Sequence, residues 1–184
     1  MFTKASRLRR LFALHRTPLL EAGVFTLNLG KIFRVEERAE ALVAEMRAEE
    51  KAVREMMKDV EPVSLFVYDS GEGTLYTIGG SSLENELVKI AGGKNIFEDV
   101  DKQHFSASIE SVIEAEPEAI AVLDYLIDVN VKLDYLKGIE EMSDVPAIKN
   151  NNIFIVPRFS ILPSVQNINA IKEFAKGLHP ELFD

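Results

Sequence analysis

Apolar residues recur at spacings of three, four and seven between about residues 29 and 60, with charged residues between them. This periodicity predicts an amphipathic α-helix of about 25 residues, roughly 38 Å long at 1.5 Å per residue. The helix should end at Glu61, because the residue before a proline is disfavoured in the α conformation. A helix of this length is long for one compact domain, so we interpret it as a strut. Its apolar positions are Val35, Ala39, Leu42, Val43, Met46, Val53, Met57 and Val60.

From residue 63 the pattern changes to short apolar runs that alternate with helical segments. This alternation favours an α/β fold with a mostly parallel open sheet and helices on both faces. We therefore predict a single Rossmann-like α/β lobe that follows the long amphipathic helix. The expected strands are 63–68, 74–78, 119–125 and 153–157, and the expected helices are 83–91, 108–115, 131–142 and 167–178.

Charge and composition limit the classes of partner and of chemical site that we expect for this protein. The formal net charge is −9, and residues 61–184 hold 21 acids against 9 bases, whereas residues 1–20 hold five basic residues and no acid. An acidic main body disfavours nucleic acid and anionic membrane surfaces as partners. The absence of cysteine excludes disulfides, thiolate metal sites and a lipid-modified cysteine on this chain. The apolar run near the start is too short for a signal peptide, so the chain as written reads as cytoplasmic or already processed.

The turn "GGSS" at 79–82 stands between a predicted strand and a predicted helix, where α/β sheets bind ligands. It matches neither a phosphate-binding P-loop nor the G-x-G-x-x-G pattern. Two interpretations stay open for Gly80 and Ser81: contact with a ligand, or ordinary turn and helix-capping duty.

The sequence contains no arrangement typical of catalysis or metal binding. His15, His104 and His179 are scattered, without the spacing of a metal site, and no nucleophile elbow surrounds any serine. We therefore expect a protein that is not an enzyme and that needs no cofactor. His104 and Phe105 follow a loop and are candidates for lining a cleft.

Two residues at predicted strand ends are candidate ligand contacts. Arg158 follows the strand 153–157 and could bind a carboxylate or another oxygen-rich anion, or pair with a neighbouring acid on the surface. Tyr125 stands at the end of the strand 119–125, just past "AIAVLD", and could stack on a ligand or cover the core.

Glu110 begins an acidic helix, at a position where the helix dipole favours a carboxylate. The neighbouring acids read as a solvated face. Glu110 itself is either a helix-start residue or a charge that meets a partner.

Taken in order, several segments resemble the substrate-binding proteins of ABC importers for iron-siderophores, haem and cobalamin. The resemblance extends over residues 28–184 and rests on the order and spacing of several motifs. They are "NLGKIFRVEERAEALVAEM" (28–46), "TIGGSSLENELVKIAGGKNIF" (77–97), "SASIESVIEAEPEAIAVLDY" (106–125), and, within 145–183, "VPAIKNNNIFIVP" and "PSVQNINAIKEFAKGLHPELF".

The resemblance implies two α/β lobes joined by one long helix, with the ligand in the cleft between them. Residues 28–61 would be the joining helix, 62–184 the C-terminal ligand-binding lobe, and 1–27 a basic leader without assignment. The family's N-terminal lobe, signal peptide and lipidation cysteine have no counterpart in this sequence. The resemblance nevertheless implies an extracytoplasmic location, periplasmic or at the cell surface.

By the same resemblance, the chain would be the solute-binding component, or a truncated part of it, of an importer for an iron-siderophore or a related chelate such as haem or a cobalamin. Glu110 matches the family's permease-docking glutamate, and the membrane would be met only through the ABC permease. The ligand-binding positions would be Gly80, Ser81, Phe105, Tyr125, Arg158 and Asn167.

Two other interpretations remain: a small cytoplasmic α/β enzyme or nucleotide-binding domain that uses the GGSS turn, and an interaction module that keeps only the docking face. Because one lobe would be missing, the apolar stripe of the long helix would lack a cover. We therefore expect homo-oligomers that form through this helix or through residues 1–27.

Overall fold

Six strands form one mixed sheet in the computed structural model, which describes residues 18–162 and 164–183. The strand order is β4-β2-β1-β5-β6, and β3 pairs with the first half of β1. Strands β1, β3, β5 and β6 run parallel to one another, whereas β2 is antiparallel to both of its neighbours, β1 and β4. The predicted α/β fold with a mostly parallel open sheet is confirmed. The strands are β1 Val63–Ser70, β2 Leu75–Ile78, β3 Gly93–Asn95, β4 His104–Ala107, β5 Ala119–Asp124 and β6 Ile153–Pro157.

Helices cover both faces of this sheet, so its central strands are apolar at successive positions. Successive side chains of a strand point to opposite faces, and β1 shows this directly. Leu65 and Val67 pack in one core cluster, while Phe66 and Tyr68 pack in another. We call the faces that carry these clusters face A and face B, respectively.

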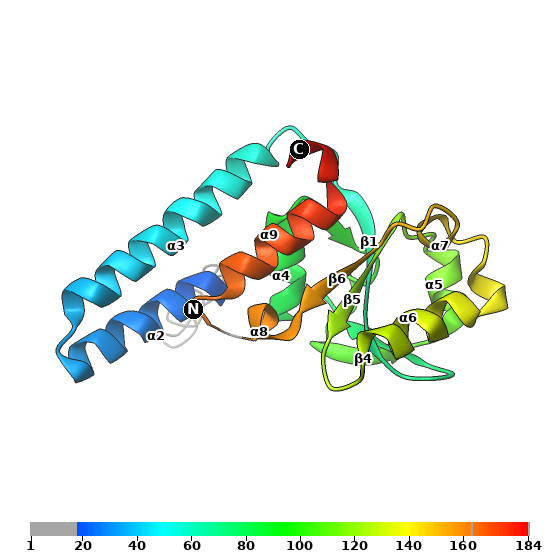
Figure 1. Ribbon diagram of the computed structural model, residues 1–184, viewed down its shortest axis with the longest axis horizontal. Helices are drawn as coiled ribbons and strands as arrows, with labels where there is room; N and C mark the ends of the chain where they lie inside the picture. The colour runs from blue at the N-terminus through cyan, green and yellow to red at the C-terminus, as the bar shows by residue number, and fades with distance from the viewer. Residues whose placement is uncertain (1–17, 163, 184) are drawn as a thin grey trace, which may run out of the picture.

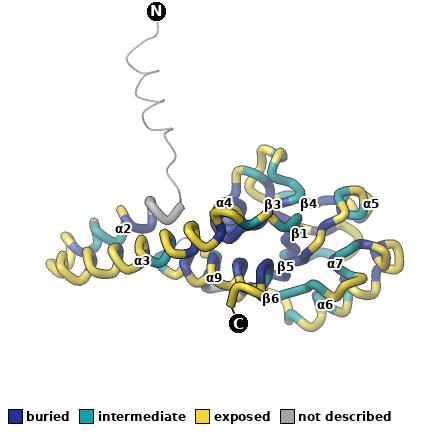
Figure 2. Tube along the Cα trace, turned by 90° about the horizontal axis from the view of Figure 1, so that it is seen from above, coloured by how far each residue is buried: buried dark blue, intermediate teal, exposed yellow. Residues whose placement is uncertain are grey.

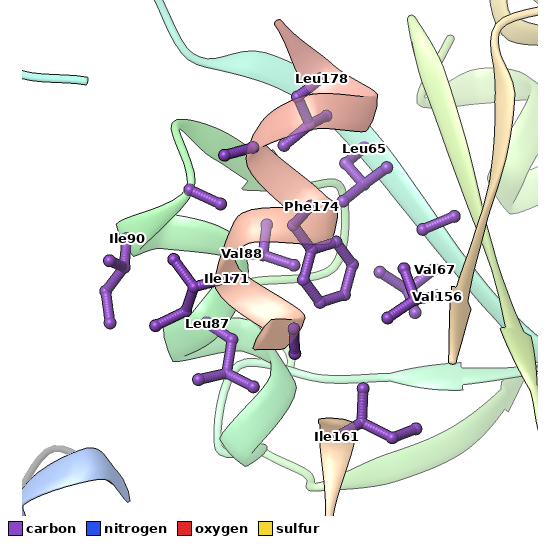
Figure 3. Close-up of a cluster of buried hydrophobic side chains, with 14 of the residues drawn as sticks. Leu65, Val67, Leu87, Val88, Ile90, Val156, Ile161, Ile171, Phe174 and Leu178 are labelled. Carbon is purple, nitrogen blue, oxygen red and sulfur yellow. The ribbon is translucent and has the colours of Figure 1, made fainter. Parts of the chain in front are cut away.

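Face A is covered by α4 (Leu83–Ile90) and α9 (Asn167–Leu178). Figure 3 shows Phe174 of α9 lying among apolar side chains of α4 and the strands, close to Val88 and Val67. The ring of Phe174 is fully buried and meets Phe154 edge-to-face at 6.3 Å. The cluster on face A is therefore a closely packed core.

Face B is covered by α5 (Ile109–Glu114), α6 (Val129–Gly138) and α7 (Pro146–Lys149), together with a 3₁₀ turn at Glu140–Met142. A short helix α8 (Arg158–Ile161) follows β6, and a second 3₁₀ turn spans Pro180–Leu182. The expected strands did not include β3 and β4, which lie between α4 and α5.

The long helix predicted over 29–60 is confirmed over α3 (Glu36–Met56), but its predicted start is wrong: residues 29–33 belong to a separate helix, α2 (Pro18–Phe33), which runs antiparallel to α3 (Figure 1). Arg34 separates them in the left-handed conformation, with φ of 57°. The Val35 N–H donates to the Gly30 carbonyl at 2.8 Å, and the Arg34 N–H donates to the Lys31 carbonyl at 3.4 Å. This bond pair is a Schellman motif, which normally has glycine at the left-handed position. No glycine marks the break, so the sequence pattern did not reveal it.

The two helices form a hairpin that extends from the sheet-containing body, with α3 beside α9 (Figure 1). Met46 and Val53 of α3 and its C-cap residue Met57 join the core cluster of face A, and Lys172 of α9 pairs with Glu49 at 2.9 Å. The hairpin is thus anchored to the lobe along α3. Residues 1–17, to which most of the predicted basic leader belongs, lie outside the described part of the chain.

The inner face of α2 is built from small residues. A Cβ atom on Gly30 would come within 2.5 Å of the Ala39 Cβ, so α2 and α3 approach too closely there for any side chain at this position. The large apolar side chains of α2 lie on its outer side instead: Phe25, Ile32 and Phe33 are 65%, 70% and 68% exposed. Figure 2 shows the hairpin as largely exposed, while the buried positions gather in the lobe.

Candidate functional site

A pocket of about 230 Å³ opens at the carboxyl ends of the parallel strands. Three strand ends contribute to it: Asp69 near the end of β1, Leu123 and Tyr125 at the end of β5, and Ile161 and Leu162 just after β6. Ligands of open α/β sheets bind at this edge, where side chains from several strands converge. We call this cavity the strand-end pocket. Its remaining lining residues are Tyr76, Glu84 and His104.

One wall of the pocket is formed by β2, β4 and α4. The rings of Tyr76 and His104 stack with centroids 6.0 Å apart and an interplanar angle of 12°. The His104 Nε2 lies 3.3 Å from the Glu84 Oε1. Glu84 is buried in the first turn of α4, which begins after the cap residue Ser82, whose hydroxyl accepts from the Asn85 N–H at 3.0 Å. A carboxylate at this position is stabilised by the helix dipole.

A buried lysine, Lys132, lies next to the pocket residues Asp69, Leu123 and Tyr125 without lining the pocket itself. The Lys132 ammonium donates to the carbonyls of Leu123 and Tyr125 at 2.6 and 2.7 Å, and stands 3.8 Å from the Asp69 Oδ1. Burial lowers the pKa of the Lys132 ammonium. These bonds fix the backbone that carries Tyr125 at the end of β5.

The buried carboxylate of Asp69 lacks part of the hydrogen bonding that would offset its loss of contact with water. Among the described residues, its buried Oδ1 atom has no hydrogen-bond partner. Burial raises the pKa of the Asp69 carboxyl, and this effect exceeds the opposing effect of the nearby Lys132 ammonium. A carboxylate in this state favours any further positive charge or hydrogen-bond donor that reaches it.

Of the residues predicted to contact ligand, Tyr125 lines the strand-end pocket. Phe105 points to face B, where it meets Phe97 edge-to-face at 5.3 Å. Its neighbour His104 lines the pocket instead, because adjacent residues of β4 face opposite sides of the sheet.

Gly80 and Ser81 hold the GGSS turn against the segment 98–102. Any side chain on Gly80 would collide with the Glu98 carbonyl, and the Ser81 hydroxyl donates to Asp101 at 2.5 Å. Neither residue is part of the pocket lining described above. The structure shows that this turn packs against the segment 98–102. Its contact with a ligand stays a prediction.

Asn167 and Arg158 lie in the segment that leads from β6 to α9. The buried Asn167 amide donates to the carbonyls of Ser160 and Leu162 at 2.7 and 2.8 Å and accepts from the Ser164 N–H at 2.9 Å. Asn167 therefore shapes the loop that brings Leu162 to the pocket. Arg158 begins α8, and its side chain lies outside the described part of the structure.

Glu110 is the second residue of α5 and is exposed, away from the strand-end pocket on face B. The Glu110 backbone N–H and the Ser108 hydroxyl hold the pKa of the Glu110 carboxyl below its usual value. The carboxylate is thus ionised and presented to solvent at neutral pH.

Sequence reasoning missed Asp69, Tyr76, Glu84 and Lys132. The position of Asp69 directly after an apolar strand was an available signal, whereas the other three become neighbours only through the sheet order. Among the described residues, no group of three histidines or acids is arranged to hold a metal ion. Over the same residues, no helix has both the length and the apolar character required to cross a bilayer.

Comparison with known proteins gives consistent matches. The sequence profile of the family described as "Periplasmic binding protein" matches residues 26–158. The vitamin B12-binding protein of Vibrio campbellii is 28% identical over 155 residues, which are 82% of this chain and 54% of that protein. The ABC transporter substrate-binding lipoprotein YvrC of Bacillus subtilis is 24% identical over 159 residues, which are 84% of this chain and 49% of that protein.

A solved structure agrees with these sequence matches. The crystal structure of a periplasmic binding protein from Veillonella parvula superimposes with a TM-score of 0.74 at 28% identity, over 84% of this chain and 54% of that one. The chain therefore spans about half the length of the relatives that it matches.

Proposed function

This chain belongs to the periplasmic binding protein family, and from that premise we propose that it is a lobe of the solute-binding component of an ABC importer. The proposed ligand is an iron-siderophore or a related chelate such as haem or a cobalamin. The proposed role is non-enzymatic and extracytoplasmic: the lobe holds one side of the chelate and docks on a permease.

The observation that carries the proposal is the strand-end pocket. It combines aromatic rings from Tyr76, His104 and Tyr125 with a few polar groups, at the edge of the sheet where α/β proteins bind ligands. Flat aromatic rings suit the faces of a macrocycle or the apolar arms of a chelate.

Exposed apolar side chains next to the pocket support a cleft that closes against a second surface. Leu126 is 79% exposed and has a positive φ of 60°, a conformation that costs a non-glycine residue stability. Ile127 and Leu162 are also exposed. Apolar groups in such positions gain free energy when a ligand or a facing lobe covers them.

The test is a titration of the chain with a ferric trihydroxamate, haem and a cobalamin, followed by calorimetry. We expect saturable one-to-one binding of at least one chelate with a Kd of about 10 µM or tighter. Tyr125→Ala should weaken this binding about tenfold or more, because it removes an aromatic contact. Phe183→Ala, an exposed aromatic residue outside the pocket lining, is the matched control and should bind like the wild type. Failure of all three chelates to bind at about 100 µM would contradict the proposal.

We further propose that Glu110 contacts the permease. Support comes from its exposure, its ionised state and its position on face B, where a partner could reach it without covering the strand-end pocket. Glu110→Gln should reduce uptake of the chelate in cells that express the permease, while the Kd for the chelate stays unchanged. Glu114→Gln, at the other end of α5, is the matched control. A loss of chelate affinity in Glu110→Gln would overturn this role.

Finally, we propose that copies of the chain associate through the outer face of α2, formed by Phe25, Leu29, Ile32 and Phe33. Supporting this, Phe25, Ile32 and Phe33 are largely exposed, and between residues 22 and 33 only Lys31 is charged. Such a surface is more typical of an interface than of a solvated helix.

A further inference from the structure

We propose that the strand-end pocket receives a positively charged, hydrogen-bond-donating group, such as the pendant ammonium of a cationic metal chelate. This inference rests on the proposed function and names the class of ligand that the site takes. It also implies that chelates with an anionic periphery bind less well.

The charges of the pocket lining are the first argument. Asp69 and Glu84 contribute two carboxylates, and the described lining side chains include no lysine or arginine. His104 lies 3.3 Å from Glu84 and, when protonated, neutralises that carboxylate. Asp69 is the other carboxylate of the lining, and its counter-charge, Lys132, is not a lining residue.

The nearby Lys132 balances the charge of Asp69 but leaves the carboxylate as a hydrogen-bond acceptor. The Lys132 ammonium spends two of its three donors on the carbonyls of Leu123 and Tyr125, and its distance of 3.8 Å from the Asp69 Oδ1 is too long for a hydrogen bond. The side chain of Lys132 is also almost completely buried, so it cannot contact a ligand in the pocket directly. Asp69 is left with an oxygen that has no hydrogen-bond donor among the described residues.

Aromatic rings complete a site suited to a cation. Tyr76, His104 and Tyr125 line the same pocket, and the face of a tyrosine ring attracts an ammonium group. The positive end of the α4 dipole could have favoured an anion here, but the buried carboxylate of Glu84 occupies the first turn of that helix.

The size of the pocket limits how much of the ligand enters it. A volume of about 230 Å³ is below the roughly 300–1,000 Å³ of sites that enclose a whole drug-sized ligand. An alkylammonium arm fits this space, whereas the metal-bearing body of the chelate would lie across the mouth beside Leu126 and Leu162.

The test compares two ferric trihydroxamates that differ at one atom group. One carries a free primary ammonium on its pendant arm, and the other carries the same arm acetylated to a neutral amide. We expect the ammonium form to bind the full chain about tenfold more tightly, because only this form supplies a charge to Asp69 and the rings.

The variant Asp69→Asn should reduce the ratio of the two affinities to about one, mainly by weakening the ammonium form. Glu84→Gln gives a second measurement if Asp69→Asn folds poorly by circular dichroism, and it should reduce the ratio by a smaller factor. Glu114→Gln removes an exposed acid from face B and should keep the wild-type ratio.

The outcomes separate this inference from the proposed function. Equal binding of the two chelates, or tighter binding of the acetylated form, overturns the charge preference and leaves the proposed function intact. Tighter binding of haem or of an anionic tris-catecholate chelate than of the ammonium form also overturns the preference. Binding of no chelate overturns both.

Discussion

The lobe and the α2–α3 hairpin solve the burial of apolar side chains in opposite ways. In the lobe, large residues such as Phe174 and Leu87 are fully buried between the sheet and its helices. In the hairpin, α2 turns its small residues inward against α3 and leaves Phe25 and Ile32 in solvent. The lobe therefore buries its large apolar side chains within itself. The apolar outer face of α2, by contrast, is typical of a helix that packs against another surface.

The difference has an energetic consequence. Burial of a large apolar side chain contributes about 1.5–3 kcal/mol of stabilising free energy. Covering the several exposed apolar side chains of the outer face of α2 would therefore stabilise the protein by several kcal/mol, which contacts among the described residues do not supply. The same free energy drives association when a second copy covers this face.

The largest expected effect distinguishes the two regions directly. Phe174→Ala should lower the free energy of unfolding by about 3–5 kcal/mol, because it leaves a cavity in the core of face A. Phe33→Ala, the same change on the exposed face of α2, should alter it by about 0.5 kcal/mol or less in the monomer. Urea unfolding at low protein concentration measures both, and equal effects would mean that α2 is buried in solution.

The second effect concerns association. The double variant Phe25→Ser and Ile32→Ser should raise the dissociation constant of the self-associated form at least about tenfold, since each serine removes buried apolar area. Sedimentation velocity over a range of concentrations gives this constant. Val131→Ser, at an exposed apolar position of α6, is the control and should associate like the wild type. A wild-type chain that stays monomeric at every concentration would rule out this interface.

A smaller effect is expected at the turn between α2 and α3. Arg34→Gly should stabilise the chain by about 1 kcal/mol, because glycine adopts the left-handed conformation without the steric cost that arginine bears. Thermal unfolding of the variant beside Arg38→Gly, an interior position of α3 that should be destabilised by about 1 kcal/mol, makes the contrast clear. Destabilisation by Arg34→Gly would show that the two helices do not separate at this residue.

The smallest effect is a pH dependence within the lobe. The folded pKa of Asp69 lies above its usual 3.8, so the folded state holds this proton more tightly than the unfolded state does. The contribution of Asp69 to stability is therefore greatest below pH 3.8 and declines as the pH rises through the raised folded value. Relative to Asp69→Asn, the wild type should lose stability over this window. A relative gain in urea unfolding at the same pH values would contradict the shift.

Much of the lobe could be predicted from its sequence, because its apolar runs are bounded by clear signals. The strand 153–157 and the helix 167–178 coincide with β6 and α9. The GGSS turn precedes α4 as expected, and Ser82 is the residue that caps this helix. The hairpin could not be predicted in the same way, since its break depends on a left-handed arginine. The only local signals were Lys31 at the end of one helix and the acids at the start of the next.

Lining residues at the end of a predicted strand could be predicted from the sequence. Lining residues that meet only through the order of strands in the sheet could not. Tyr125 follows an apolar strand, which marks the edge where ligands bind. Asp69 and Glu84 do not stand out in a chain with many acids. They reach the same pocket only because β2, β1 and β5 are neighbours in the sheet. Phe105 was the predicted ligand contact, but His104 lines the pocket, because adjacent residues of β4 face opposite sides of the sheet. The sequence pattern did not reveal this strand, so it could not show which of the two residues faces the pocket.

Amide hydrogen exchange with and without a saturating chelate tests the central claim most directly. If the lobe binds through the strand-end pocket, protection should increase at the ends of β1 and β5, around 69–70 and 123–127, and in the segment 160–162. The outer face of α2 should be unchanged at a constant state of association. Protection confined to α2, or no change at the strand ends with the chelate bound, would contradict the account.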